Sequence, residues 1–275
     1  MIIQKQQKYL REGIKSHPDN DTLNYNYAIA LIAIKKFFKG ALILRKLLSK
    51  YPTNNEILFS YSNALNQLKK YNLSLKYYLK LYSIDETNID VVINIGIVFI
   101  ALENYNKALS FLKLAFNARS NSSLISRNIG LCHKHLNNLD EAIYYYTKSI
   151  KFEETYIGSY IALGSIFLDS NKNKLADETF KKASNIAKKI IENYKTTHVE
   201  ETILNDIGVL FAIIGNFSLA EKTLKILEDR FESNSSHKML LSEILLSMGK
   251  FEEGWIYYES RFDYYLKEKK TNNYK

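Results

Sequence analysis

Small and apolar residues recur along this chain with a fixed period of 34 residues. Three kinds of residue mark the period: the prolines Pro18 and Pro52, the glycines Gly96, Gly130 and Gly164, and the alanines Ala108, Ala142 and Ala176. Within each period, apolar residues follow one another at intervals of about three or four, which is the spacing of one helix face. The pattern therefore predicts a repeated unit made of helices.

Each period predicts two helices that approach closely. Counted from Asp21, positions 7, 11, 17 and 24 are mostly apolar, whereas positions 8 and 20 are small. A large side chain at a small position would push the two helices apart. Repeats then begin at residues 21, 55, 89, 123 and 157, and resume at 201 and 235 after roughly ten additional residues near 185–200. Because one helix pair cannot bury both of its faces, neighbouring pairs are expected to stack.

A period of 34 residues with two helices resembles the tetratricopeptide repeat. The resemblance implies an all-α fold, a right-handed α-solenoid of about seven antiparallel helix pairs over residues 21–263. Residues 1–20 then form a partial repeat, either a bare capping helix or the end of a longer array, and residues 264–275 a polar tail. The additional residues near 185–200 are expected to lengthen a second helix, either as a simple change of loop length or as a change of pitch or an interaction spur.

Composition agrees with a folded helical chain. The sequence is 46% hydrophobic and 24% charged, and two prolines are few enough to allow long helices. The net charge of +9 comes from dispersed lysines, which indicate a solubilising surface or an attraction to acidic proteins, nucleic acid or lipid headgroups. The sequence shows neither an apolar stretch long enough to span a membrane nor a signal peptide, so a cytoplasmic location is expected.

Asparagines recur on the predicted first helices. In the tetratricopeptide family, the concave groove is lined by positions that include position 6, which here reads Asn26, Ser60, Asn94, Asn128, Ala162 and Asp206. This series resembles the asparagine ladder of O-linked N-acetylglucosamine transferases, whose amides bind a peptide backbone. An amide offers a donor and an acceptor to each peptide unit. Alternatively, asparagine is merely abundant here and tolerated on a wet helix face, and Ser60 and Ala162 interrupt the series.

The resemblance implies a groove that binds a protein or an extended peptide segment. The candidate binding residues are Asn26, Asn63, Gln67, Asn94, Arg127, Asn128, Lys134, Asp169, Asn205 and Asp206. The basic clamp of chaperone-binding repeats has no counterpart at the matching positions, so acidic chaperone tails are not expected as ligands.

The last repeat carries a second resemblance. Its segment Gly-Lys-Phe-Glu-Glu-Gly-Trp-Ile-Tyr-Tyr-Glu-Ser-Arg, residues 249–261, is similar to the end of bacterial repeat arrays that lead into a glycosyltransferase-like domain. Trp255 is expected to close the apolar end of the array, with Glu259 and Arg261 facing solvent or a further domain. The residues given after Arg261 are too few for a catalytic domain, so we expect such a domain to have been lost, to be encoded separately, or to belong to a longer chain of which this is a fragment.

The search for catalytic chemistry yields one cluster, Cys132-His133-Lys134-His135. Its spacing does not converge like a metal-binding pair four residues apart, and a reactive cysteine needs a base and an electropositive pocket. We therefore expect Cys132 and His133 to pack in the core, and His135 to reach the groove. The prediction is a non-catalytic scaffold without cofactor or metal, with the substrate-recognition array of a glycosyltransferase system as the alternative. Nucleic acid is not expected, because base-reading helical repeats have a longer period.

Overall fold

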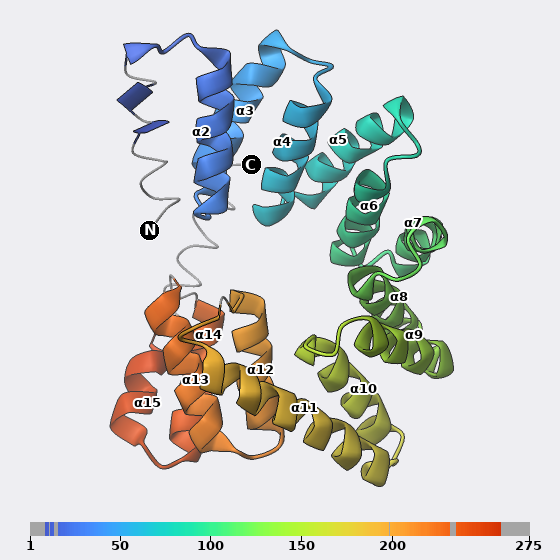
Figure 1. Cartoon of the computed structure of the whole chain (residues 1–275), viewed down its shortest axis with the longest axis vertical. Coiled ribbons are helices and arrows are strands. Elements are labelled where there is room, and N and C mark those ends of the chain that lie inside the picture. Colours follow the sequence, from blue (N-terminus) through green and yellow to red (C-terminus); the bar gives the residue numbers. More distant parts are fainter. Residues whose placement is uncertain (1–8, 11, 14–15, 198, 232–234, 260–275) are drawn as a thin grey trace. The chain divides into compact units, whose positions relative to one another are not determined.

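The chain folds as an all-α protein. The computed structural model describes residues 9–10, 12–13, 16–197, 199–231 and 235–259, and within them it contains α-helices and no β-strand (Figure 1). The fold class expected from the sequence is thus confirmed. The predicted tail and Arg261 lie outside the described residues, as does most of the helix predicted before Asp21.

The helices come in pairs, and their bounds follow the repeat. The first helices are α2 (Asp21–Ala33), α4 (Asn55–Gln67), α6 (Ile89–Ala101), α8 (Ser123–His135), α10 (Ile157–Asp169), α12 (Glu201–Ile213) and α14 (Ser235–Ser247). The second helices are α3 (Phe37–Lys50), α5 (Tyr71–Ile84), α7 (Tyr105–Ala118), α9 (Leu139–Phe152), α11 (Asn173–Asn193), α13 (Phe217–Arg230) and α15 (Phe251–Tyr258). Each first helix has 13 residues, and α11, with 21, is the longest helix in the described part of the chain.

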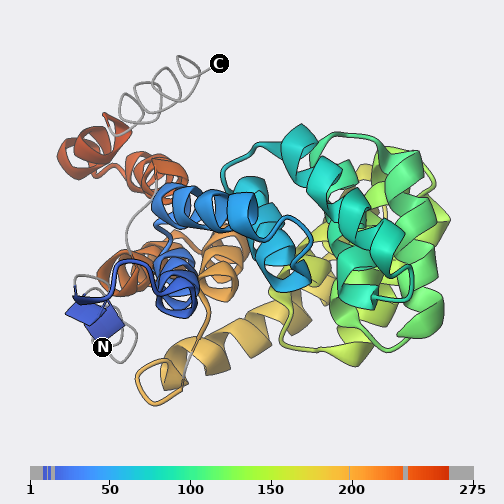
Figure 2. The ribbon, with the colours of Figure 1, turned by 90° about the horizontal axis from the view of Figure 1, so that it is seen from above.

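The helices form two compact units. Unit 1 ends at Asn138 and contains α2 to α8, and unit 2 begins at Leu139 and contains α9 to α15. Figure 2 shows α11 of unit 2 as a long, continuous yellow helix. The second helices α3, α5, α7, α11 and α13 each pack against the first helix of their own pair and that of the next pair. First helices also contact one another, as α2 does with α4 and α10 with α12.

The two helices of a pair approach most closely at position 8. A Cβ atom built on Gly96 of α6 would lie 2.7 Å from Cγ of Leu112 on α7. At Gly164 of α10 the same atom would overlap with Cε1 of the Phe180 ring on α11. Carbon atoms in contact are normally separated by about 3.5–4.0 Å. Glycine is therefore the residue that fits at these two crossings, as the small positions of the sequence indicate.

Serine occupies position 8 at two other crossings, and a serine hydroxyl forms a hydrogen bond across each of them. In the second pair, Ser74 Oγ on α5 donates to the main-chain carbonyl of Ser62 on α4 at 2.8 Å. In the last pair, Ser242 Oγ on α14 donates to the carbonyl of Gly254 on α15 at 2.9 Å. These serines are fully buried, so the bonds satisfy polar groups that are shielded from water.

Every turn within a pair ends the first helix in the same way. In the first pair, the Lys36 N–H donates to the Leu31 carbonyl at 2.8 Å and the Lys35 N–H donates to the Ile32 carbonyl at 2.9 Å. This pattern is the Schellman motif, and its central residue has a positive φ. The seven such residues are Lys35, Lys69, Glu103, Asn137, Asn171, Gly215 and Gly249, with φ between 56° and 75°. Only two are glycine, the residue that adopts this conformation without strain.

Asparagine also begins several helices. The side chains of Asn20, Asn54 and Asn88 accept hydrogen bonds from the main chain at the starts of α2, α4 and α6. Ser122 does the same at α8. These residues are N-caps, which satisfy main-chain donors that a helix leaves open at its start. Part of the high asparagine content therefore serves capping.

The additional residues of the fifth repeat lengthen α11. Ala183, Ala187 and Ile191 lie one helical turn apart and are buried, so the extension packs into the core of unit 2. At its end, Arg230 Nη1 of α13 donates to the carbonyl of Tyr194 at 2.9 Å, and the guanidinium lies 5.7 Å from the Tyr194 ring centroid. The extension is a docked part of the fold and not a projecting spur.

Ion pairs hold α13 to the last helix pair. The Glu221 carboxylate of α13 accepts from Lys225 at 2.8 Å and from Lys250 at 2.7 Å, and Lys225 Nζ also lies 3.2 Å from Glu253 of α15. These hydrogen bonds, with that of Lys225 first, lower the pKa of Glu221 below its usual value. The carboxylate is therefore stabilised in its charged form by the fold.

The crossing at Gly164 predicts a severe cost for added volume. Gly164→Ala places a methyl group against the Phe180 ring and is expected to destabilise the chain by about 1–3 kcal/mol, measured by chemical unfolding followed by circular dichroism. The double variant Gly164→Ala with Phe180→Leu should recover part of the loss, because it removes the ring atoms in conflict. Unchanged stability in the single variant would mean that the helices cross elsewhere.

The left-handed turn at Glu103 predicts that glycine at this position would stabilise the folded chain. Glu103→Gly relieves a left-handed main-chain conformation and is expected to gain about 0.5–1 kcal/mol in unfolding free energy, after the added freedom of the unfolded chain is counted. Gly215→Ala, at the equivalent turn of unit 2, should lose a similar amount. A destabilised Glu103→Gly chain would contradict a left-handed conformation at this turn.

The pKa of Glu221 predicts an acid-sensitive last pair. Because this pKa is lowered on folding, the stabilisation is fully present above the unfolded value near 4.5 and is lost as the pH falls through the folded value. Urea unfolding between pH 7 and pH 3 should show a steeper loss of stability for the natural chain than for Glu221→Gln. Glu192→Gln, which removes an exposed glutamate of α11, should keep the natural pH slope, and equal slopes in all three chains would refute the prediction.

Candidate functional site

The ten residues predicted to bind a ligand all lie on first helices. Seven belong to unit 1 and three, Asp169, Asn205 and Asp206, to unit 2. Their exposure differs widely. Asn26, Gln67 and Asp169 are exposed, Asn63, Asn94, Arg127, Lys134, Asn205 and Asp206 are partly buried, and Asn128 is buried. Even the four that share position 6 range from exposed to buried, so the repeat does not produce a uniform row of accessible side chains.

We call the asparagines at position 6, namely Asn26, Asn94 and Asn128, the ladder. Two of them, Asn26 and Asn94, have amide atoms available to a ligand. Asn26 on α2 is exposed, and its side chain makes no hydrogen bond with the described residues. Asn94 on α6 donates from Nδ2 to the Asp90 carbonyl one turn earlier, at 2.8 Å. This bond fixes the amide plane, and no described residue donates to Asn94 Oδ1. Asn94 thus offers an oriented acceptor.

Ser60, which stands between Asn26 and Asn94 in the position-6 series, links two neighbouring first helices. The Tyr25 hydroxyl of α2 and Ser60 Oγ of α4 lie 3.1 Å apart and share a hydrogen bond. A ligand that used Ser60 would compete with this contact. The serine that interrupts the asparagine series in the sequence thus has a structural partner.

Asn63 has a partner inside its own helix pair. Its Oδ1 accepts a hydrogen bond from the hydroxyl of Tyr78, a residue of α5 that is fully buried. Burial raises the pKa of Tyr78, so the phenol stays protonated and needs an acceptor. Asn63 therefore supports the core, and a ligand could reach only its remaining donor.

Asn128 differs from the expectation of an accessible ladder residue. It is 6% exposed, and its Nδ2 has no hydrogen-bond acceptor among the described residues. Sequence position alone missed this burial, because it depends on what packs over α8 rather than on α8 itself.

The cysteine and histidine cluster of α8 has a packing role. Cys132 is fully buried and His133 is 6% exposed, which confirms the expected core positions. Burial raises the pKa of the Cys132 thiol to about 12, so it is not a nucleophile at neutral pH. His135, expected in the groove, stacks on Tyr105 of α7 with ring centroids 4.4 Å apart. The described residues contain no group of three or more histidine, cysteine or acidic side chains that could hold a metal ion.

In unit 2, Asp206 lies against the preceding first helix. A Cβ built on Gly158 of α10 would lie 2.7 Å from Asp206 Oδ2 of α12, so the absence of a side chain there makes room for the carboxylate. Asp206 is therefore part of the contact between two first helices. Asp169 at the end of α10 remains exposed.

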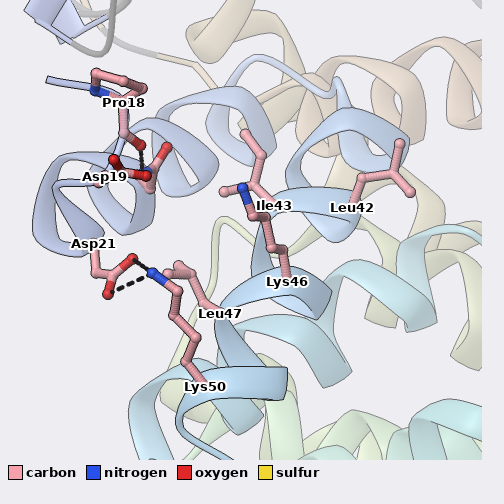
Figure 3. A pocket seen from close by; sticks show the side chains of 9 residues that line it. Pro18, Asp19, Asp21, Leu42, Ile43, Lys46, Leu47 and Lys50 are labelled. Atoms are coloured by element: carbon pink, nitrogen blue, oxygen red, sulfur yellow. Dashed lines mark hydrogen bonds and ion pairs between the residues drawn. The ribbon is translucent and has the colours of Figure 1, made fainter. Parts of the chain in front are cut away.

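A hollow that the sequence did not predict lies between the start of α2 and α3 (Figure 3). Its volume is about 250 Å³, and it is lined by Pro18, Asp19, Asp21, Asn24, Leu42, Ile43, Lys46, Leu47 and Lys50. Lys50 Nζ lies 2.9 Å from Asp21 Oδ1, and the Tyr51 hydroxyl donates to the same carboxylate at 2.8 Å. The bonds from Lys50 and Tyr51 lower the pKa of Asp21. Asp21 and Lys50 therefore form an ion pair at the edge of this hollow.

Trp255, on the last helix α15, does not lie where the sequence predicted. Trp255 is 54% exposed and makes an edge contact with Tyr258, with ring centroids 5.2 Å apart. The expectation that it closes the apolar end is therefore wrong. The reason is that α15 turns its small residue, Gly254, toward Leu246 of α14, which points the next side chain away from the core. Glu259 is exposed, as expected.

Stacked helix pairs with one recurring turn and one recurring crossing define a solenoid built from helix pairs. The tetratricopeptide repeat family model matches residues 56–88, 128–156 and 157–190, in segments of both units. These three segments are tetratricopeptide repeats by sequence, and the described helices have the fold of a tetratricopeptide-repeat array. No curated protein matches its sequence.

Solved structures share this fold at low sequence identity. A tetratricopeptide repeat protein from Parabacteroides merdae is 15% identical, with a TM-score of 0.64 over 88% of this chain and 92% of that one. MamA from Desulfovibrio magneticus RS-1 is 18% identical, with a TM-score of 0.58 over 62% of this chain and 97% of that one. Human IFIT1 in a dimer with m7Gppp-AAAA is 17% identical, with a TM-score of 0.55 over 95% and 67% of the two chains. The fold is in general a scaffold that binds protein or other ligands without catalysis.

Proposed function

We propose that this chain is a non-catalytic scaffold that holds an extended peptide segment of a partner protein along the first helices of unit 1. The observation that carries the proposal is the oriented amide of Asn94, with a free acceptor, together with the exposed amide of Asn26. A peptide backbone offers N–H and carbonyl groups to which such amides are complementary. Backbone contacts of this kind bind many sequences.

Charge supports a neutral or basic segment over an acidic one. α2, α4 and α6 contain no lysine or arginine, and each contains one acidic residue, namely Asp21, Glu56 and Asp90. Among the first helices of unit 1, an acidic tail would meet lysine or arginine only on α8, which carries Arg127 and Lys134. The proposal therefore rests on amide contacts and not on a carboxylate clamp.

A partner captured through the ladder should be lost when both amides are removed. Partners pulled down from source lysate would be compared, by mass spectrometry, between the natural chain, Asn26→Ala with Asn94→Ala, and a matched control, Asn72→Ala with Asn106→Ala, at exposed asparagines of α5 and α7. A peptide from the recovered partner should bind the ladder variant about tenfold more weakly, because two hydrogen bonds are lost. Equal recovery by all three chains would refute the ladder.

A second candidate is the substrate-recognition array of a glycosyltransferase system whose catalytic domain is not in this chain. It is favoured by the segment from Gly249 to Tyr258 and by the exposure of Phe251, Trp255 and Ile256 on α15, a face that another module would cover. Recovery of a glycosyltransferase in the same pull-down, lost in a Trp255→Ser chain, would select this candidate. RNA among the captured material would instead overturn the prediction that nucleic acid is not a partner.

A further inference from the structure

The charges of unit 1 are divided between its two kinds of helix. The second helices α3, α5 and α7 contain no aspartate or glutamate. They carry eight basic residues, four on α3, two on α5 and two on α7. These are Lys39, Arg45, Lys46, Lys50, Lys76, Lys80, Lys107 and Lys113.

The second helices of unit 2 do not share this division. On α13, three basic residues accompany three acidic ones, and on α11 five lysines accompany three acidic residues. A purely cationic set is therefore a property of α3, α5 and α7, and not a general consequence of the net charge of +9.

Exposed apolar side chains lie among these cations. Phe38 and Leu42 of α3 are 60% and 46% exposed, and Leu114 of α7 is 51% exposed. Leu73, Leu79 and Ile84 of α5 are also exposed. Exposed apolar side chains that gather in one patch among polar residues mark a surface that binds a protein or a membrane.

The basic and apolar residues occupy the same repeat positions. Position 25 holds Arg45, Leu79 and Lys113, and position 26 holds Lys46, Lys80 and Leu114. Positions 18, 19, 22, 25, 26 and 30 fall within one side of a helix that advances 100° per residue. That side is exposed, because the remaining surface of each second helix packs against two first helices. We call these residues of α3, α5 and α7 the basic–apolar face.

We propose that the basic–apolar face docks this protein on the surface of an anionic lipid bilayer. Lysine and arginine would lie at the lipid phosphates while Phe38, Leu42 and Leu114 enter the boundary between headgroups and acyl chains. Helices that lie in a membrane interface place basic residues at the headgroups and apolar residues at the acyl chains in the same way. None of the described helices is long and apolar enough to cross a membrane, so the binding is peripheral.

The cations are available for this contact. Lys39, Lys46, Lys76 and Lys113 are exposed and make no ion pair with any described residue. Lys50 is held by Asp21 at 2.9 Å and is not needed for the proposal. Charges without partners in the fold retain their full attraction for an external anion.

The apolar side chains favour a bilayer over a nucleic acid. A single strand is bound by cations together with aromatic rings on which bases stack, and a duplex by cations and polar groups. On the basic–apolar face the exposed large side chains are leucine and isoleucine, with Phe38 as the one exposed aromatic ring at the described positions. Aliphatic side chains gain little from a polyanion in water and much from lipid.

Vesicle sedimentation of the full chain tests the proposal. Vesicles of phosphatidylcholine alone would be compared with vesicles that also contain phosphatidylserine. The natural chain should bind the anionic vesicles and not the neutral ones. Lys39→Gln, Lys46→Gln, Lys76→Gln and Lys113→Gln together should lower binding about a hundredfold or more. Phe38→Ser with Leu42→Ser should lower it about tenfold, by loss of apolar insertion.

A matched control distinguishes an effect of the basic–apolar face from an effect of the protein's net charge. Lys181→Gln, Lys182→Gln, Lys188→Gln and Lys189→Gln remove four exposed lysines of α11 and should leave vesicle binding nearly unchanged. Equal loss in both lysine variants, or equal binding to neutral vesicles, would overturn the proposal. So would binding of a single-stranded RNA oligonucleotide without binding of anionic vesicles. All the variants in the vesicle experiment alter second helices, whereas the ladder variant alters first helices. The outcome of the peptide-binding experiment is therefore independent of the outcome with vesicles.

Discussion

The close approach of two helices at position 8 is the constraint on which each repeat depends. With glycine or serine there, the side chain at position 24 of the second helix, such as Leu112 or Phe180, fills the space over the first helix and is removed from water. The Schellman turn brings the chain back at the angle that this contact requires. Once a pair is set, its remaining apolar surface can be covered only by the next pair, so stability spreads along each unit by neighbour contacts.

The packing of the pairs leaves two kinds of surface with different chemistry. First helices contact one another and present amides and a few carboxylates. Second helices of unit 1 present lysine, arginine and exposed aliphatic side chains. Under the two proposals, a peptide on the first helices and a lipid surface on the second helices would not compete for the same residues.

The sequence predicted the fold well because packing at the crossings demands small residues, and small residues recur visibly. It did not reveal the turns, because five of the seven positive-φ positions hold lysine, glutamate or asparagine and lack the glycine that would mark them. The candidate site was predictable only as a set of positions. Asn63 accepts a hydrogen bond from Tyr78, and Asn128 is buried. Both facts depend on side chains of other helices, and the position of a residue in the repeat does not specify those. Trp255 was misjudged for the same reason, since the direction of one side chain on a helix follows from which neighbour is small.

The length of α11 has a further consequence for stability. Its 21 residues exceed the 14 of α13 by seven, which adds about two turns, or about 10 Å, of second helix. The first helices α10 and α12 on either side of it still contact each other, so the added turns do not separate them. Ala183, Ala187 and Ile191 bury the extension in the core of unit 2. In an array held together by contacts between neighbours, an interruption of the period is therefore not a weak point when the inserted residues bring their own buried surface.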